Sequence, residues 1–182
     1  MLKADFITKV NQWQNWLAQA TQPQYDIALF KIWIQMEVFC SDIFIDYCLG
    51  RPSENHYTVP RLVSFQSEEQ LFAFLREGSK KYIDYLAMIE KLSKHIFQQN
   101  PFEVLTIDST YSKVCREIKS IRNFVAHESN ESEKKYRNEC LSGGQFIDPN
   151  TYLLRKKGSE SIYTYYINSL LTMVDVLITE PA

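Results

Sequence analysis

The stretch from Tyr25 to Leu49, YDIALFKIWIQMEVFCSDIFIDYCL, decides the fold of this 182-residue chain. Its apolar residues recur every three or four positions, the spacing of one face of an α-helix. This stripe consists of Leu29, Trp33, Met36, Cys40, Ile43 and Tyr47, and it is widened by Phe30, Ile34 and Phe44. A helix that is apolar on several faces packs against more than one neighbour or forms a dimer seam. We therefore expect a central helix from about Gln24 to Leu49.

Charged residues along the same stretch argue against a membrane span. They are Asp26, Lys31, Glu37, Asp42 and Asp46. Each would be costly in lipid, and together they cover the whole segment. The chain also reaches Lys3 and Asp5 without a preceding apolar run, so no signal peptide is expected. The sequence therefore predicts a cytoplasmic protein without membrane contact.

Helical periodicity continues on both sides of this stretch. It predicts further helices over about residues 6–20, 67–77, 82–96, 109–127, 131–141 and 162–177. Residues 51–66 are expected to form a loop, and residues 143–158 a small hairpin or an ordered loop. The predicted fold class is all-α: a single helical-bundle domain over residues 1–182, with a small irregular or hairpin insert near 143–158.

The helix expected over residues 109–127 has a buried stripe formed by Val114, Ile118, Ile121 and Val125. Asp108 or Ser109 can cap its start. Ordinary surface charge is expected on its other faces, from Arg116, Glu117 and Lys119. Asn130 with Glu133 is expected to cap the next helix, so a break should fall close to position 127.

Composition excludes several classes of protein. With 45% hydrophobic residues, 14% aromatic residues and five glycines, the chain suits packed helices rather than disorder. A net charge of −2 argues against a protein that coats nucleic acid with a broad basic face. The cysteines at 40, 48, 115 and 140 have no zinc-ligand spacing, and the three histidines lie far apart. We expect reduced, mostly buried thiols and neither a metal nor a cofactor.

A polar cluster ends the helix over residues 109–127, at Arg122-Asn123-Phe124-Val125-Ala126-His127. Histidine titrates near neutral pH, so His127 can take a proton from a ribose 2′-hydroxyl. Arginine stays charged and presents a planar fork of donors, which suits Arg122 to hold phosphate oxygens. Asn123 can position the substrate or the imidazole. These are the groups needed to cleave RNA without a metal.

Helix geometry limits how these three side chains can meet. Arg122 and His127 lie about 140° apart around an ideal helix, whereas Asn123 and His127 share a face. Either the helix ends or bends near Ala126, or two copies of the motif meet across a dimer interface. We favour a homodimer with a composite cleft, because twofold symmetry brings identical surfaces together. An acid on the central helix is a further candidate to orient Arg122 by a salt bridge: Glu37, Asp42 or Asp46.

At these residues the chain resembles the HEPN superfamily, whose signature is an arginine, usually a polar residue next, and a histidine a few positions later. Arg122, Asn123 and His127 match that signature position by position. The resemblance implies an all-helical, dimeric, metal-independent endoribonuclease of toxin-antitoxin, abortive-infection or other phage-defence systems. Its substrate would be RNA, and an antitoxin or a neighbouring defence protein would be its partner.

Two short basic clusters could supply local RNA contacts. Lys134, Lys135 and Arg137, just beyond the motif, are the predicted RNA-binding residues, whereas the run from Arg155 to Lys157 is explained as well by a solvated turn. Of the other histidines, His56 is expected in a surface loop and His95 beside the core face of its helix. Two alternatives stay open. One is a catalytically inactive HEPN-like dimer that binds a protein or a nucleotide, with the motif as a hydrogen-bond network at the seam. In the other, Arg122 and His127 are structural residues, and His127 ends its helix and interacts favourably with the helix dipole.

Overall fold

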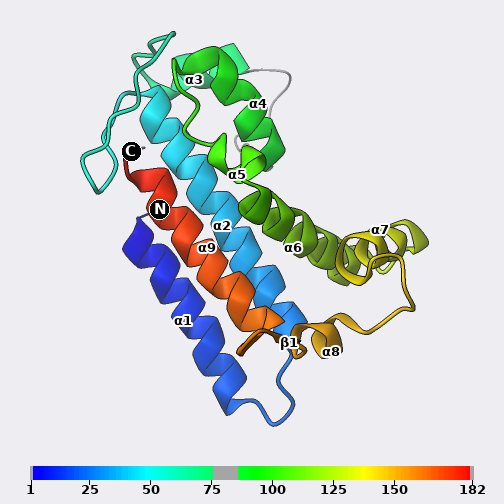
Figure 1. The fold of residues 1–182 in the computed structure, drawn as a ribbon. Helices are drawn as coiled ribbons and strands as arrows, with labels where there is room; N and C mark the ends of the chain where they lie inside the picture. Colours follow the sequence, from blue (N-terminus) through cyan, green and yellow to red (C-terminus); the bar gives the residue numbers. More distant parts are fainter. Residues whose placement is uncertain (1, 76–85, 181–182) are drawn as a thin grey trace.

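The computed structural model describes residues 2–75 and 86–180, and these are mostly helical (Figure 1). Three long helices lie side by side: α1 (Lys3–Gln19), α2 (Tyr25–Cys48) and α9 (Ile162–Ile178). α6 (Ser109–His127) packs against α2 and α9, and α7 (Asn130–Leu141) packs against α6. The predicted all-α class is confirmed.

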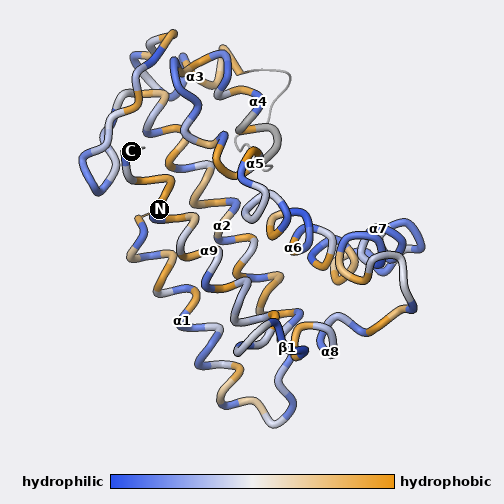
Figure 2. The backbone as a smooth tube through the Cα atoms, in the orientation of Figure 1, coloured by the Kyte–Doolittle hydropathy of each residue, from blue (hydrophilic) through white to orange (hydrophobic). Residues whose placement is uncertain are grey.

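α2 is central because its predicted stripe is buried. All six residues of that stripe belong to the core, and the helix contacts α1, α6, α9 and α4 (Leu86–Ile96). Apolar residues recur along α2 and α9 (Figure 2). Packing against several neighbours explains why apolar side chains cover more than one face of α2. Within the described residues, no helix is long and apolar enough to cross a membrane.

Shorter helices gather at the C-terminal end of α2 (Figure 1). They are α3 (Glu68–Leu75), α4 (Leu86–Ile96) and α5 (Val104–Ile107). α3 begins where the sequence predicts, because Ser67 Oγ accepts a hydrogen bond from the Gln70 backbone N–H at 3.3 Å. The predicted helix end at Glu77 and the next predicted helix residue, Tyr82, lie outside the described residues. α5 was not predicted, since a single turn is too short to show a 3.6-residue period.

The junction between α6 and α7 follows the predicted break, with one correction. Asp108 caps α6, because its carboxylate accepts two backbone N–H groups of the first turn at 2.8 and 3.0 Å. Glu128 then adopts the left-handed conformation, with φ 45°, and α6 ends. The predicted Asn130 cap is wrong. The chain turns within Glu128, so Asn130 is already helical, and Ser129 caps α7 by accepting from the Ser132 backbone N–H at 3.2 Å.

The insert before the last helix contains the predicted small hairpin. Its elements are α8 (Pro149–Leu153), β1 (Lys156–Lys157) and β2 (Glu160–Ser161). The two strands pair antiparallel, and Gly158 has φ 66° in the turn between them, a conformation that glycine adopts without strain. The hairpin lies slightly later in the chain than predicted. α8, another short turn of helix, was not predicted.

Glu117 is buried, although the sequence analysis placed it on an exposed face. Its Oε2 accepts a hydrogen bond from the Tyr166 hydroxyl at 2.9 Å. Burial raises the pKa of Tyr166, so this hydroxyl stays protonated and donates. The sequence contains a signal for this burial. Glu117 lies three residues after Val114 and four before Ile121, which puts it on the same face as the buried stripe.

Candidate functional site

The three motif side chains line one concave surface, where the C-terminal half of α6 meets the middle of α2 and the start of α7. This surface includes Arg122, Asn123 and His127 and has a volume of about 300 Å³. Its other lining residues are Glu37, Lys119, Ser129, Glu131, Ser132 and Lys135. We call it the motif pocket.

Arg122 is held from two helices. Its Nη1 donates to Asn123 Oδ1 at 3.0 Å, and its Nη2 lies 3.8 Å from Glu37 Oε2. Its guanidinium carbon also lies 5.9 Å from the centre of the Phe30 ring, within range of a cation–π interaction. Of the acids proposed to orient this arginine, Glu37 forms the ion pair, whereas Asp46 pairs with Arg51 at 2.9 Å.

The Arg122 guanidinium keeps capacity for another acceptor. The 3.8 Å separation from Glu37 is an ion-pair distance rather than a hydrogen-bond distance. Nε is buried and has no hydrogen-bond partner among the described residues. The side chain is 25% exposed, so the ends of the fork can still meet solvent or a ligand. An anion in the motif pocket would therefore compete with Glu37 for Nη2.

Glu37 is itself fixed by the core. Its Oε1 accepts a hydrogen bond from the buried Trp33 indole Nε1 at 3.0 Å, and its side chain is only 14% exposed. A carboxylate anchored by an indole has little freedom to turn away from its partner cation. Glu37 thus holds the guanidinium group of Arg122 close to α2.

His127 is the last residue of α6, and its side chain is exposed. Within the described residues, no hydrogen bond joins its imidazole to Arg122 or Asn123. Helix geometry predicted that one unbroken helix would bring the three together poorly, and α6 is indeed unbroken up to His127. The shared surface arises because α7 folds back beside α6 and closes the pocket at Ser129 and Ser132.

The three predicted RNA-binding residues of α7 do not all face the motif pocket. Lys135 lines it and pairs with Glu131 at 2.8 Å. Lys134 and Arg137 line a separate concave surface, and Arg137 Nε donates to the Gly144 carbonyl at 2.9 Å. Helix geometry explains the separation, because positions 134 and 137 lie about 100° and 160° around the helix from position 135.

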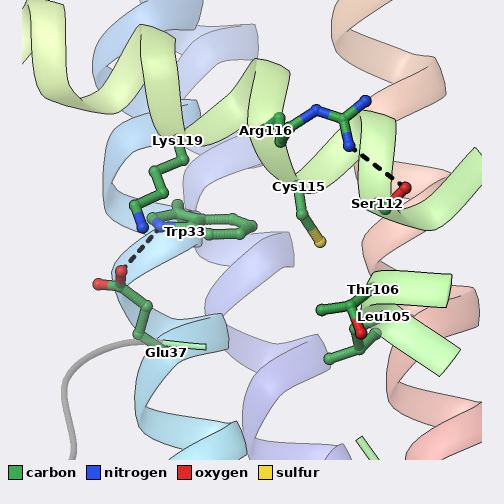
Figure 3. A pocket seen from close by; sticks show the side chains of 8 residues that line it. All are labelled: Trp33, Glu37, Leu105, Thr106, Ser112, Cys115, Arg116 and Lys119. Atoms are coloured by element: carbon green, nitrogen blue, oxygen red, sulfur yellow. Dashed lines mark hydrogen bonds between the residues drawn. The ribbon is translucent and has the colours of Figure 1, made fainter. Parts of the chain in front are cut away.

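A second pocket adjoins the first, and the two share Glu37 and Lys119. Its volume is about 230 Å³. Trp33 and Glu37 lie on one side of it, and Leu105 and Thr106 of α5 lie on the opposite side (Figure 3). The remaining lining residues are Ser112, Cys115, Arg116 and Lys119. We call it the Trp33 pocket. This pocket could not be predicted from the sequence, because one of its walls belongs to α5, which is too short to show a helical period.

Lys119 takes on a different role from the one expected, whereas Cys115 is a free, half-buried thiol, in line with the prediction. Lys119 is half-buried between the two pockets, whereas the sequence analysis read it as ordinary surface charge. Burial raises the pKa of the Cys115 thiol to about 12. The thiol is therefore protonated at neutral pH and forms an apolar wall rather than a nucleophile.

The remaining histidines lie apart from this region. His56 is exposed in the loop after α2, as expected, and His95 is exposed on α4 rather than lying beside its core face. Among the described residues, no group of three or more His, Cys, Asp or Glu side chains is arranged to hold a metal ion. All four cysteines are free thiols.

Comparisons of the chain with family models, with curated proteins and with solved structures find no match. The resemblance to the HEPN superfamily therefore rests on Arg122, Asn123 and His127 and on their place at the end of a helix.

Proposed function

We propose that the protein is a metal-independent endoribonuclease that acts as a homodimer with a composite Arg122, Asn123 and His127 site. The observation that carries this proposal is that the three side chains line one concave surface. An arginine braced by an amide and a carboxylate, beside an exposed imidazole, offers charge stabilisation and proton transfer at one place.

The proposed reaction is internal transfer at a phosphodiester. His127 removes the proton of a ribose 2′-hydroxyl, and the 2′-oxygen attacks the neighbouring phosphorus. The bond from phosphorus to the 5′-oxygen of the next nucleotide breaks, and that oxygen takes up a proton from the imidazolium of the second copy. The products are a 2′,3′-cyclic phosphate and a 5′-hydroxyl. Arg122 stabilises the charge on the pentacoordinate phosphate, and Asn123 positions Arg122 through the 3.0 Å hydrogen bond.

The surface of α2 beside the motif pocket supports a dimer seam. Val38 is 43% exposed, and Phe30 and Ile34 are half-buried on the same helix. These three residues are spaced four apart, so they form one partly exposed apolar row on α2 that a second chain can cover. We propose that a second copy docks on this face, with its own His127 at the same cleft.

We propose RNA as substrate and Lys135 as a contact to its backbone at the motif pocket. Lys134 and Arg137, on the other side of α7, would hold RNA that extends beyond the cleft. We also propose the biological setting that the resemblance implies: toxin-antitoxin or phage defence, with an antitoxin or a neighbouring defence protein as partner. Genomic neighbours that encode such a partner would support it.

The test is cleavage of a mixed cellular RNA pool in EDTA. Wild-type protein should cut RNA and leave cyclic-phosphate ends, whereas His127→Ala and Arg122→Ala should lose cleavage. His95→Ala is the matched control, because it removes an exposed histidine far along the chain on α4. Circular dichroism should show that all variants remain helical. Undiminished cleavage by His127→Ala or by Arg122→Ala would refute the mechanism.

A second candidate is a dimeric HEPN-like module without catalysis that binds a protein or a nucleotide. The observation in its favour is that Arg122 contacts Asn123, Glu37 and Phe30. These contacts hold α6 against α2, so Arg122 has a structural role even without catalysis. This candidate predicts no RNA cleavage by the wild-type protein. With the motif at the dimer seam, it also predicts that Arg122→Ala and His127→Ala weaken dimerisation, measured by sedimentation equilibrium.

A further inference from the structure

We infer that the Trp33 pocket binds the nucleobase of the nucleotide whose phosphate occupies the motif pocket. This inference rests on the proposed function, which it deepens by giving the ribonuclease a base preference. The two pockets together would form one nucleotide site, with a basic part at the end of α6 and a largely apolar part between α2, α5 and α6.

The walls of the Trp33 pocket match the surface of a nucleobase. A base has two flat apolar faces and an edge that carries donors and acceptors. Apolar atoms of Trp33, Leu105 and the protonated Cys115 thiol line the inner end of the pocket, where Trp33 and Leu105 are 1% and 3% exposed. Polar groups surround them: Glu37, Thr106, Ser112, Arg116 and Lys119. Small-molecule sites have this composition of apolar walls and a few polar groups that fix orientation.

The size of the pocket favours a single ring system. Its volume of about 230 Å³ lies below the roughly 300–1,000 Å³ usual for sites that take drug-sized ligands. Thr106 and Arg116 are exposed at its edge, so a ligand can enter from solvent. Figure 3 shows Trp33 and Thr106 on opposite sides of this space, with the Cys115 side chain projecting from α6 between them in this view.

The connection between the pockets fits one nucleotide. Glu37 and Lys119 line both pockets, so the two lie next to each other, and the inferred nucleotide spans both. Cys115 and Arg122 are seven residues apart on α6, about 10 Å along the helix axis. The base, ribose and phosphate of one nucleotide suit that reach. The ammonium group of Lys119 would lie between the base and the phosphate.

The first measurement compares ligands that differ only by the base. Calorimetry would give the affinity of the full chain for ribose 5-phosphate and for each of the four nucleoside 5′-monophosphates. At least one nucleotide should bind about tenfold more tightly than ribose 5-phosphate, since contacts to one base commonly contribute that much. Four nucleotides that bind within about twofold of ribose 5-phosphate, or that do not bind at all, would overturn the inference.

The second measurement uses a variant that fills the pocket. Ser112→Phe places a large ring at the wall of the pocket on α6. It should abolish the extra affinity that the base gives a nucleotide, while ribose 5-phosphate binds as before. Thr110→Phe is the matched control, because residue 110 is exposed on the same helix and lines neither pocket. If Ser112→Phe still binds a nucleotide more tightly than ribose 5-phosphate by the wild-type factor, the inference would also be overturned.

The two proposals can fail separately. If cleavage depends on His127 but no base increases the affinity, the proposed ribonuclease function would stand and the inferred nucleobase pocket would not. Conversely, a gain lost in Ser112→Phe, together with no cleavage of RNA, would retain the pocket and leave the protein as a nucleotide-binding module.

Discussion

Glu37→Gln separates the two roles of this carboxylate. Glutamine keeps a side-chain oxygen that can accept the hydrogen bond from Trp33 Nε1, but it removes the charge that faces Arg122. Two unit charges 3.8 Å apart attract by about 4 kcal/mol at an effective dielectric constant of about 20. Desolvation of the carboxylate and the partial exposure of Arg122 offset most of this attraction. We expect a net loss of about 1 kcal/mol in the free energy of unfolding.

Glu37→Ala should destabilise the protein further. It also removes the acceptor of the buried Trp33 indole N–H, and an unsatisfied buried donor costs about 1–3 kcal/mol. Thermal unfolding followed by circular dichroism measures both variants. Glu37→Gln should lower the Tm by about 2–4 °C, and Glu37→Ala should lower it more.

Binding of inorganic phosphate gives an independent readout of the same change. In Glu37→Gln, no carboxylate at position 37 competes with phosphate for Arg122 Nη2. The affinity of the motif pocket for phosphate should therefore rise about fivefold. Equal destabilisation by glutamine and alanine would refute the assigned role of the indole hydrogen bond. Weaker phosphate binding by Glu37→Gln would refute the competition between Glu37 and the ligand.

Three further changes test the surrounding fold. Tyr166→Phe should cost about 1–3 kcal/mol in denaturant unfolding, because the buried Glu117 carboxylate loses its donor. Asp108→Ala should cost about 1 kcal/mol in the same assay, because the first turn of α6 loses its cap. Burial raises the pKa of Cys115 and Cys140 from 9.0 to about 12, so the unfolded chain loses these protons first. The free energy of unfolding should therefore fall as the pH rises from about 9 toward 12. This fall should be smaller in the Cys115→Ala and Cys140→Ala variants than in the wild-type protein.

The sequence predicts the helices that are long and regular. α2 follows from an unbroken apolar stripe, and the cap at Asp108 follows from side-chain chemistry next to that helix. α5 and α8 could not be predicted, because each spans about one turn, which is too short to show a 3.6-residue period. Ser129 and Asn130 are both good capping residues, and only the conformation of Glu128 decides between them.

The candidate site was predictable in its residues but not in its shape. The chemistry of Arg122, Asn123 and His127 can be read from the sequence, and an acid on α2 was a reasonable partner for the arginine. The pocket itself depends on the way α7 folds back, which helix periodicity does not determine. Lys119 is an example. Its spacing from the buried stripe predicts ordinary surface charge, but in the structure it is half-buried between the two pockets.

The single left-handed residue between α6 and α7 makes this site sensitive to chain length. Glu128 turns the chain within one position, so the walls of the motif pocket keep their relative placement only while the connection has its present number of residues. Insertions in surface connections usually cost little free energy. One extra residue after His127 would rotate the start of α7 relative to the end of α6. The length of this link is therefore a constraint on the site in its own right, separate from the identity of the residues that line it.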